Sequence, residues 1–288
     1  MKVIMVPVAD RPECRHALAV AGDLAERFQA NLVGCHLRPH RSEKLQRGGF
    51  QFNWLIGREA GGEGLESESA ARLKSAAARK LFADVAQSRG LRLAQRIRVG
   101  GERSAQWHEL VGSLEHLFSI AGPMSDLSLV SRPKNNARGR SIDFMLGAIL
   151  YSGRPVLVLP QRRLASLGQR VTIAWNQSGL AARAVSAAMP LLQSAESVHI
   201  VVCGKEDRPG PKSAALVRYL AQWGVASTRE VTAGRKPEQE LDAVCKKRKS
   251  DLVVMGAYSR SRMRQVVWGG FTQHMLFNST RPVFLVHD

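Results

Sequence analysis

The sequence predicts an α/β fold made of two tandem Rossmann-like domains, each a five-stranded parallel sheet between helices. Short apolar runs of strand length alternate with longer segments whose apolar residues recur at helical spacing. This order of segments also occurs twice: SDLSLVSRP matches SDLVVMGAY later in the chain, and GRPVLVLP matches TRPVFLVH. Such an internal duplication indicates two domains, which we place at 1–160 and 170–288.

The first domain begins with a β-α-β unit. An apolar, β-rich run opens the chain, a stripe of apolar residues three and four apart follows, and a second apolar run comes before residue 40. Two parallel strands joined by one helix form a right-handed crossover. Strands are expected at 2–8, 31–37, 91–99, 127–131 and 155–159. Helices are expected at 14–28, 67–89, 104–121 and 141–151.

The second domain repeats this plan after a linker at 161–169. Its strands are expected at 171–175, 197–203, 226–232, 251–255 and 282–287. Its helices are expected at 179–192, at 212–223, at 237–249 and after the glycine pair Gly269-Gly270.

A polar, glycine-rich segment at 39–64 interrupts the first domain and holds Phe50, Phe52 and Trp54. Such a long connection is either a functional cover or poorly ordered. Its aromatic group is either a lid over the first domain or a contact patch for a partner, and we favour the contact.

The composition is that of a soluble globular protein, with 44% hydrophobic and 23% charged residues. No apolar run approaches the roughly 18 residues of a membrane span, and the N-terminal run is too short for a secretory signal, so we expect a cytoplasmic protein without a membrane partner. The four cysteines lack metal-ligand spacing, so no metal site is predicted. The net charge of +18 indicates either a polyanionic partner such as nucleic acid or simply a solvated basic surface, which we favour.

The stretch DLVVMGAYSRSRMRQVVWGGFT has the order of an anion cradle. An apolar run ends in Gly256, a polar loop follows, and Gly269-Gly270 opens a segment of helical character. Backbone N–H groups and a helix dipole can then face an anion. Three arginines in the loop either clamp phosphates or are solvated: Arg260, Arg262 and Arg264.

On these motifs the chain resembles the universal stress protein family in its tandem two-domain form, over nearly its whole length and least over 40–65. The family's nucleotide loop, G-x2-G-x9-G-[ST], is kept in spacing as Gly256, Ser259, Gly269 and Gly270. The resemblance implies that Gly256 and Gly269 approach phosphates through their backbone. Ser259 replaces a glycine, and Gly270 lacks the hydroxyl that Thr272 would offer nearby.

The resemblance also places an adenine base at the end of the first strand of the second domain. There Asn176 would hydrogen-bond the base, Trp175 would offer a stacking surface, and Val202 and Met255 would line the base or ribose. The implied nucleotide-binding residues are Ala174, Trp175, Asn176, Val202, Met255, Gly256, Ser259, Gly269, Gly270, Phe271 and Thr272.

The equivalent site in the first domain is expected to be degenerate. Pro7, Val8 and Ala9 stand at the base positions, Ser131 replaces the first glycine, and Ile142-Asp143 replaces the glycine and hydroxyl. An aspartate at a helix start repels phosphate.

The resemblance therefore implies a stress-response binding protein that takes ATP or a related adenine nucleotide in its second domain, with the two domains packed as a pseudo-dimer across their fifth strands. We do not expect an enzyme, and any ATP hydrolysis should be incidental. The loop offers no general base, and Asp251 should lie at the end of the sheet opposite the loop. Two alternatives stay open: a nucleotide-free protein whose basic surface binds a protein or nucleic acid, and, by fold analogy alone, an adenylyl-transferring enzyme, although its H-x-G-H loop is absent. A homodimer of the tandem chain is also left open.

Overall fold

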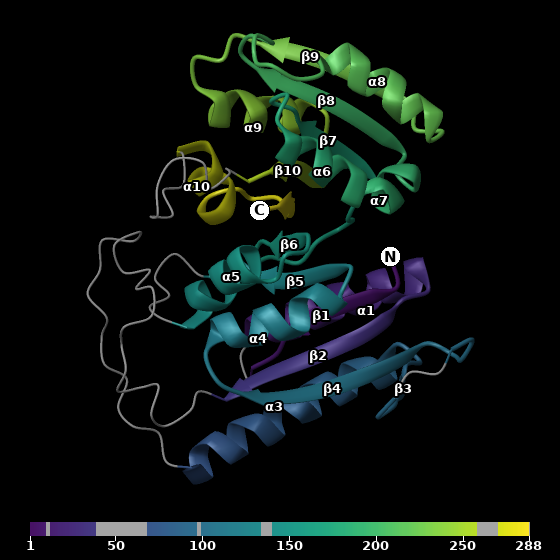
Figure 1. The fold of residues 1–288 in the computed structure, drawn as a ribbon, viewed down its shortest axis with the longest axis vertical. Helices are drawn as coiled ribbons and strands as arrows, with labels where there is room; N and C mark the ends of the chain where they lie inside the picture. Colours follow the sequence, from purple (N-terminus) through teal and green to yellow (C-terminus); the bar gives the residue numbers. More distant parts are fainter. Residues whose placement is uncertain (10–11, 39–67, 97–98, 134–139, 258–269, 288) are drawn as a thin grey trace. The chain divides into compact units, whose positions relative to one another are not determined.

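The computed structural model describes residues 1–9, 12–38, 68–96, 99–133, 140–257 and 270–287 (Figure 1). The chain divides into two compact units, Met1–Arg154 and Pro155–Asp288, which we call unit 1 and unit 2 and describe separately. The aromatic group at Phe50, Phe52 and Trp54 lies outside the described residues. Within the described ranges, no helix is both long and apolar enough to span a membrane.

Unit 1 contains one sheet with the strand order β3-β4-β2-β1-β5, and its pairs are parallel. Its strands are β1 (Val3–Pro7), β2 (Asn31–Arg38), β3 (Arg92–Leu93), β4 (Ser104–Val111) and β5 (Leu127–Ser131). Its helices are α1 (Pro12–Phe28), α3 (Glu68–Ser88), α4 (Leu114–Ala121), the short 3-10 helix η1 (Gly122–Met124) and α5 (Arg140–Tyr151).

Unit 2 has the strand order β6-β11-β10-β7-β8-β9. Its strands are β6 (Val156–Leu159), β7 (Arg170–Ala174), β8 (Ser197–Cys203), β9 (Ser227–Thr232), β10 (Leu252–Gly256) and β11 (Val283–Val286). Its helices are α6 (Gly179–Ala187), α7 (Met189–Gln193), α8 (Ser213–Gln222), α9 (Pro237–Lys247) and α10 (Gly270–Phe277). Four pairs are parallel, while β6 runs antiparallel to β11.

Apolar strands covered on both faces explain why the sheets are parallel and central. Ile4 to Val6 of β1 and Leu252 to Met255 of β10 are buried along both faces of their strands, as in doubly wound folds. In unit 1, α1 packs with α3 while α4 packs with α5 (Figure 1). The predicted α/β, Rossmann-like fold is confirmed, and β6 pairs with β11 as expected for the two fifth strands.

One predicted element is wrong. The helix expected at 104–121 is instead the strand β4 followed by α4. Seven residues of β4, from Ala105 to Val111, pair in parallel with β2, and Ser113 starts α4 by accepting a hydrogen bond from His116 N at 3.2 Å. The strand expected at 91–99 shrinks to the two residues of β3. The spacing of apolar residues in 104–111 fits both a half-exposed strand and a helix, so spacing alone did not distinguish the two.

The duplication is visible in hydrogen bonds at the amino ends of the strands. Asp126 accepts the backbone N–H groups of Lys2 and Val3, and Asp251 accepts those of Gln169 and Arg170. Both carboxylates therefore hold the start of the first strand of their repeat. Asp251 thus lies at the amino end of β10, opposite the carboxyl end at Gly256, as the sequence predicted.

A second shared turn precedes the last strand of each repeat. Ser152 Oγ donates to Arg154 O at 3.2 Å, and Ser279 Oγ donates to Arg281 O at 3.5 Å. Arg154 Nε then reaches a carbonyl before β5, and Arg281 Nε reaches the carbonyl before β10 at Ser250. The two sequence repeats are therefore built alike at this end of their sheets.

Candidate functional site

The carboxyl ends of two neighbouring strands form the candidate site in each unit. In unit 1 these strands are β1 and β5, and in unit 2 they are β7 and β10. From each pair the chain winds outward in opposite directions, which is the switch point where parallel α/β sheets bind ligands.

Gly256 ends β10 against the start of α6. A Cβ atom on Gly256 would lie 2.5 Å from the backbone N of Ala181 and 2.6 Å from the carbonyl carbon of Leu180. A side chain here would therefore collide with backbone, which cannot move as a flexible side chain does. The predicted phosphate glycine is thus also a packing glycine.

Asn176 positions the start of α6 through its side chain. Its Oδ1 accepts hydrogen bonds from Ser178 N at 3.2 Å and from Ser178 Oγ at 2.7 Å. Ser178 is the N-cap and in turn accepts from Ala181 N at 3.1 Å. The carboxamide oxygen of Asn176 is therefore engaged in the turn by Ser178.

The Trp175 ring differs from the predicted open stacking surface. The residue is 3% exposed, and its Nε1 donates to Pro211 O at 2.9 Å. Trp175 directly follows β7, and its backbone N donates to Val201 O at 2.8 Å. The indole is part of the hydrophobic core of unit 2.

Gln177 fastens the loop at 204–212 to the end of β7. Its Nε2 donates to the carbonyls of Arg208 and Gly210 at 3.1 Å each, and its Oε1 accepts from Arg208 N at 3.3 Å. Gln177 is buried, and its φ of 61° lies in the left-handed region. Residues other than glycine are uncommon in that region. Sequence reasoning missed this residue, whose side-chain role depends on a loop distant in sequence.

The other predicted nucleotide-binding residues of unit 2 differ in their exposure to solvent. Met255 is paired with Ala174 on neighbouring strands, and both Met255 and Val202 are buried. Thr272 is 1% exposed, so the structure does not present its hydroxyl at the surface as expected. Gly270 is exposed and Phe271 half-buried at the start of α10. Ser259, Gly269 and the three loop arginines (Arg260, Arg262 and Arg264) lie outside the described residues.

The two helices that follow the candidate loops differ in charge at their first turns. No acidic residue occupies the first turn of α10, whereas Asp143 occupies that of α5. The last turn of α10 is held by α9, because His274 Nε2 lies 2.9 Å from Asp242 Oδ2, and Arg281, after the helix, lies 3.2 Å from Asp242 Oδ1. The first turn of α10 therefore lacks the carboxylate that stands in the first turn of α5.

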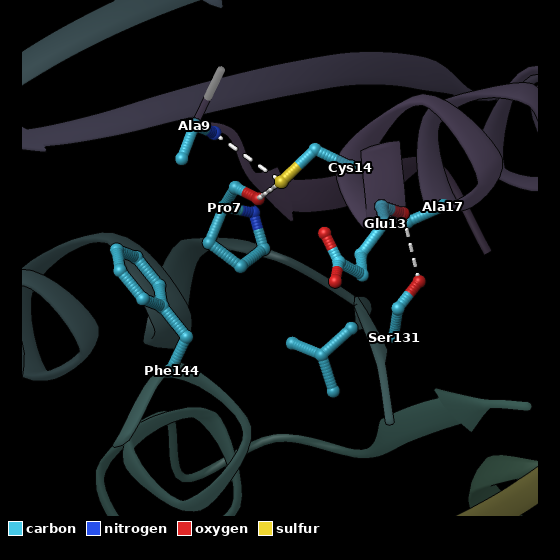
Figure 2. Close-up of a pocket in the computed structure, with 8 residues that line it drawn as sticks. Pro7, Ala9, Glu13, Cys14, Ala17, Ser131 and Phe144 are labelled. Atoms are coloured by element: carbon cyan, nitrogen blue, oxygen red, sulfur yellow. Dashed lines mark hydrogen bonds between the residues drawn. The ribbon is translucent and has the colours of Figure 1, made fainter. Parts of the chain in front are cut away.

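A pocket lies at the switch point of unit 1 (Figure 2). It is a small recess of about 40 Å³ that is partly open to solvent. Most of its lining is apolar, and the lining residues are Pro7, Ala9, Glu13, Cys14, Ala17, Val130, Ser131 and Phe144. The sequence named Pro7, Ala9 and Ser131 here but missed Glu13, Cys14 and Phe144, although Glu13 stands in the first turn of the helix after the first strand.

The polar groups of this pocket mostly bond to one another. Ser131 Oγ donates to Glu13 O at 2.9 Å, and Ala9 N donates to Cys14 Sγ at 3.3 Å (Figure 2). The thiol of Cys14 is 3.9 Å from Pro7 O. Nearby, Arg132 is 5% exposed, and burial lowers its pKa to about 10, but it is not among the lining residues. Of the described residues, no group of acidic, His or Cys side chains is arranged to hold a metal ion.

Comparison with known proteins identifies the fold and the second repeat. Residues 178–287 match the model of the universal stress protein family. A universal stress protein from Archaeoglobus fulgidus is similar over 99% of this chain and 96% of its own, with a TM-score of 0.71 at 14% identity. A functionally unknown protein from Pseudomonas aeruginosa covers 100% of this chain and 92% of its own, with a TM-score of 0.57 at 14% identity. No curated protein matches the chain.

Proposed function

We propose that this chain, whose residues 178–287 match the model of the universal stress protein family, is a stress-response binding protein that takes ATP or a related adenine nucleotide in unit 2. The observation that carries the proposal is the number of residues between the end of β10 and the start of α10. β10 stops at Gly256 and α10 starts at the exposed Gly270, without an acidic residue in the first turn. A loop of this length between a strand and a helix start suits a phosphate chain.

The base lies, in this proposal, beside Asn176 with the loop at 204–212 as a wall. The NH₂ group of Asn176 donates to a ring nitrogen, while its oxygen stays with Ser178. Gln177 holds the wall in place through three hydrogen bonds. Pre-formed walls of this kind reduce the ordering cost of binding.

Binding rather than catalysis is the proposed role. Phosphoryl transfer needs a group that orients the nucleophile and carboxylates that hold Mg²⁺. Asp251, the acid nearest in sequence to β10, is engaged at the opposite end of the sheet by Ser166 and two backbone N–H groups. Any hydrolysis is then slow and incidental.

Isothermal titration calorimetry with ATP tests the proposal on the wild type and on Gly270→Asp. A Cβ at Gly270 meets nothing within 4 Å, so the variant should fold, while its carboxylate repels phosphate as Asp143 does in unit 1. We expect the variant to lose ATP binding. Gly270→Ser, which restores the hydroxyl of the family motif, should tighten it several-fold.

Ser113→Asp is the matched control, because it adds the same charge at a helix start of unit 1 and still caps α4. It should bind ATP like the wild type. A wild type that gives neither heat nor a thermal shift with ATP would refute the nucleotide site. Salt-dependent retention on DNA under those conditions would favour the alternative that the +18 charge suggests.

A further inference from the structure

The pocket of unit 1 is not explained by nucleotide binding. It occupies the position of the nucleotide site in the repeat, yet Ser131 replaces the glycine of unit 2 and the next helix begins with Asp143. Its walls are the apolar groups of Pro7, Ala17, Val130 and Phe144. An apolar pocket with few polar groups is the usual form of a small-molecule site.

The one ionisable carboxylate of the pocket lining is that of Glu13. It stands in the first turn of α1, is half-buried, and points towards Pro7 from the side opposite Phe144 (Figure 2). Within the described parts of the chain, no hydrogen bond or ion pair engages its carboxylate oxygens. Its backbone carbonyl is fixed by Ser131 Oγ at 2.9 Å, which positions the residue.

The dipole of α1 partly stabilises the Glu13 charge, and a cation in the apolar pocket would compensate it further. A cation compensates a carboxylate best, and charge-assisted hydrogen bonds are roughly twice as strong as neutral ones. The remaining polar groups do not compete for this role, because Cys14 and Ser131 are bonded to the backbone of Pro7, Ala9 and Glu13.

We infer that the pocket of unit 1 binds a small organic cation, with its ammonium group on the Glu13 carboxylate and its apolar body against Pro7, Val130 and Phe144. This site is separate from the nucleotide site proposed for unit 2 and does not depend on it. The overall charge of +18 repels cations at long range. The preference for a cation over a neutral or anionic ligand therefore comes from the nearby Glu13 carboxylate. This preference should grow as added salt screens the distant positive charges.

Three ligands of one size test the inference on the wild type by calorimetry and thermal shift: benzylammonium, benzyl alcohol and benzyl phosphate. We expect benzylammonium to bind at least ten-fold more tightly than benzyl alcohol, and benzyl phosphate not to bind. Equal affinity for the amine and the alcohol, preference for the phosphate, or no binding of any of the three would each overturn the inference.

Glu13→Gln and Glu115→Gln locate the effect. Glu115 is also an acid in the first turn of a helix of unit 1, so both variants lose the same charge and the same helix-dipole contact. Glu13→Gln should abolish the preference for the amine, and Glu115→Gln should keep it. A preference that survives Glu13→Gln would assign the amine to another site and overturn the inference.

Cys14 provides a readout within the pocket. Its Sγ lines the cavity, so benzylammonium should slow alkylation of Cys14 by iodoacetamide at least five-fold. Cys203, half-buried in unit 2, is the internal reference and should react at an unchanged rate. ATP should protect neither Cys14 nor the amine site. Unchanged alkylation of Cys14 at saturating amine would place the amine elsewhere.

Discussion

The two repeats are alike at the amino ends of their strands and different at the carboxyl ends. Asp126 and Asp251 make the same hydrogen bonds to the first strand, and the Ser-x-Arg turn precedes the last strand in both. At the other end, Ser131 and Asp143 in unit 1 stand where unit 2 has Gly256 and an uncharged helix start. The two repeats therefore agree where hydrogen bonds stabilise the sheet and differ at the candidate sites.

Gly256→Ala should cause the largest loss in the free energy of unfolding, and the equivalent change in unit 1 should cause a smaller one. The added Cβ would collide with the backbone at the start of α6, and overpacking of this kind costs about 3 kcal/mol. Ser131→Ala in unit 1 loses only the bond to Glu13 O, about 1 kcal/mol. Urea unfolding measures both losses. Equal losses would show that Gly256 is not required for packing.

The paired aspartates should give the next largest effect. Asp126→Ala and Asp251→Ala each leave backbone N–H groups of a first strand without their acceptor, and each should lower the free energy of unfolding by about 2 kcal/mol. Hydrogen exchange should report each loss in its own unit. A loss confined to one variant would contradict the structural equivalence of the repeats.

Releasing the loop wall should weaken nucleotide binding moderately. Gln177→Ala removes the hydrogen bonds that hold the loop at 204–212, and we expect about ten-fold weaker ATP binding because the wall must then be ordered on binding. The amine affinity of unit 1 should not change. Tighter ATP binding in calorimetry would show instead that the loop blocks the site.

Acid should affect unit 2 slightly through Glu240. The Thr232 hydroxyl and then the Gly234 N–H hold the pKa of this carboxyl at about 2, below its ordinary value of 4.5. Because the folded-state pKa is lowered, its stabilisation is complete above pH 4.5 and is lost as the pH falls towards 2. Unfolding of Glu240→Gln should therefore differ most from wild type at pH 7, differ less at pH 3 and converge with it only as the pH approaches 2. A difference that is constant across this range would contradict the assignment.

Most of the fold was predictable because buried parallel strands have a strong sequence signature. The runs at Ile4, Leu127, Leu252 and Val283 are apolar on both faces, and the structure places strands there. The error at Ser104–Val111 arose because this strand is half-exposed and its apolar residues also fit a helical stripe.

The candidate sites were less predictable because side-chain direction and distant loops decide them. The proposed role of Asn176 came from the family resemblance at a strand end, whereas the burial of Trp175 depends on the contact of its indole with Pro211. The pocket around Glu13 depends on Phe144, which follows β5 by more than ten residues and is brought back by the helix α5.

The pairing of β6 with β11 has a consequence for the history of the chain. The strand 156–159 ends the first repeat in sequence but forms hydrogen-bonded pairs with the final strand of the second. A fragment that begins at residue 170 would keep every strand of the second repeat and yet expose the backbone of β11 as an open edge. Such an edge recruits another strand, so the fragment should self-associate. The tandem chain carries both strands in one polypeptide, whereas a single repeat would need a second molecule to supply the strand that pairs with β11.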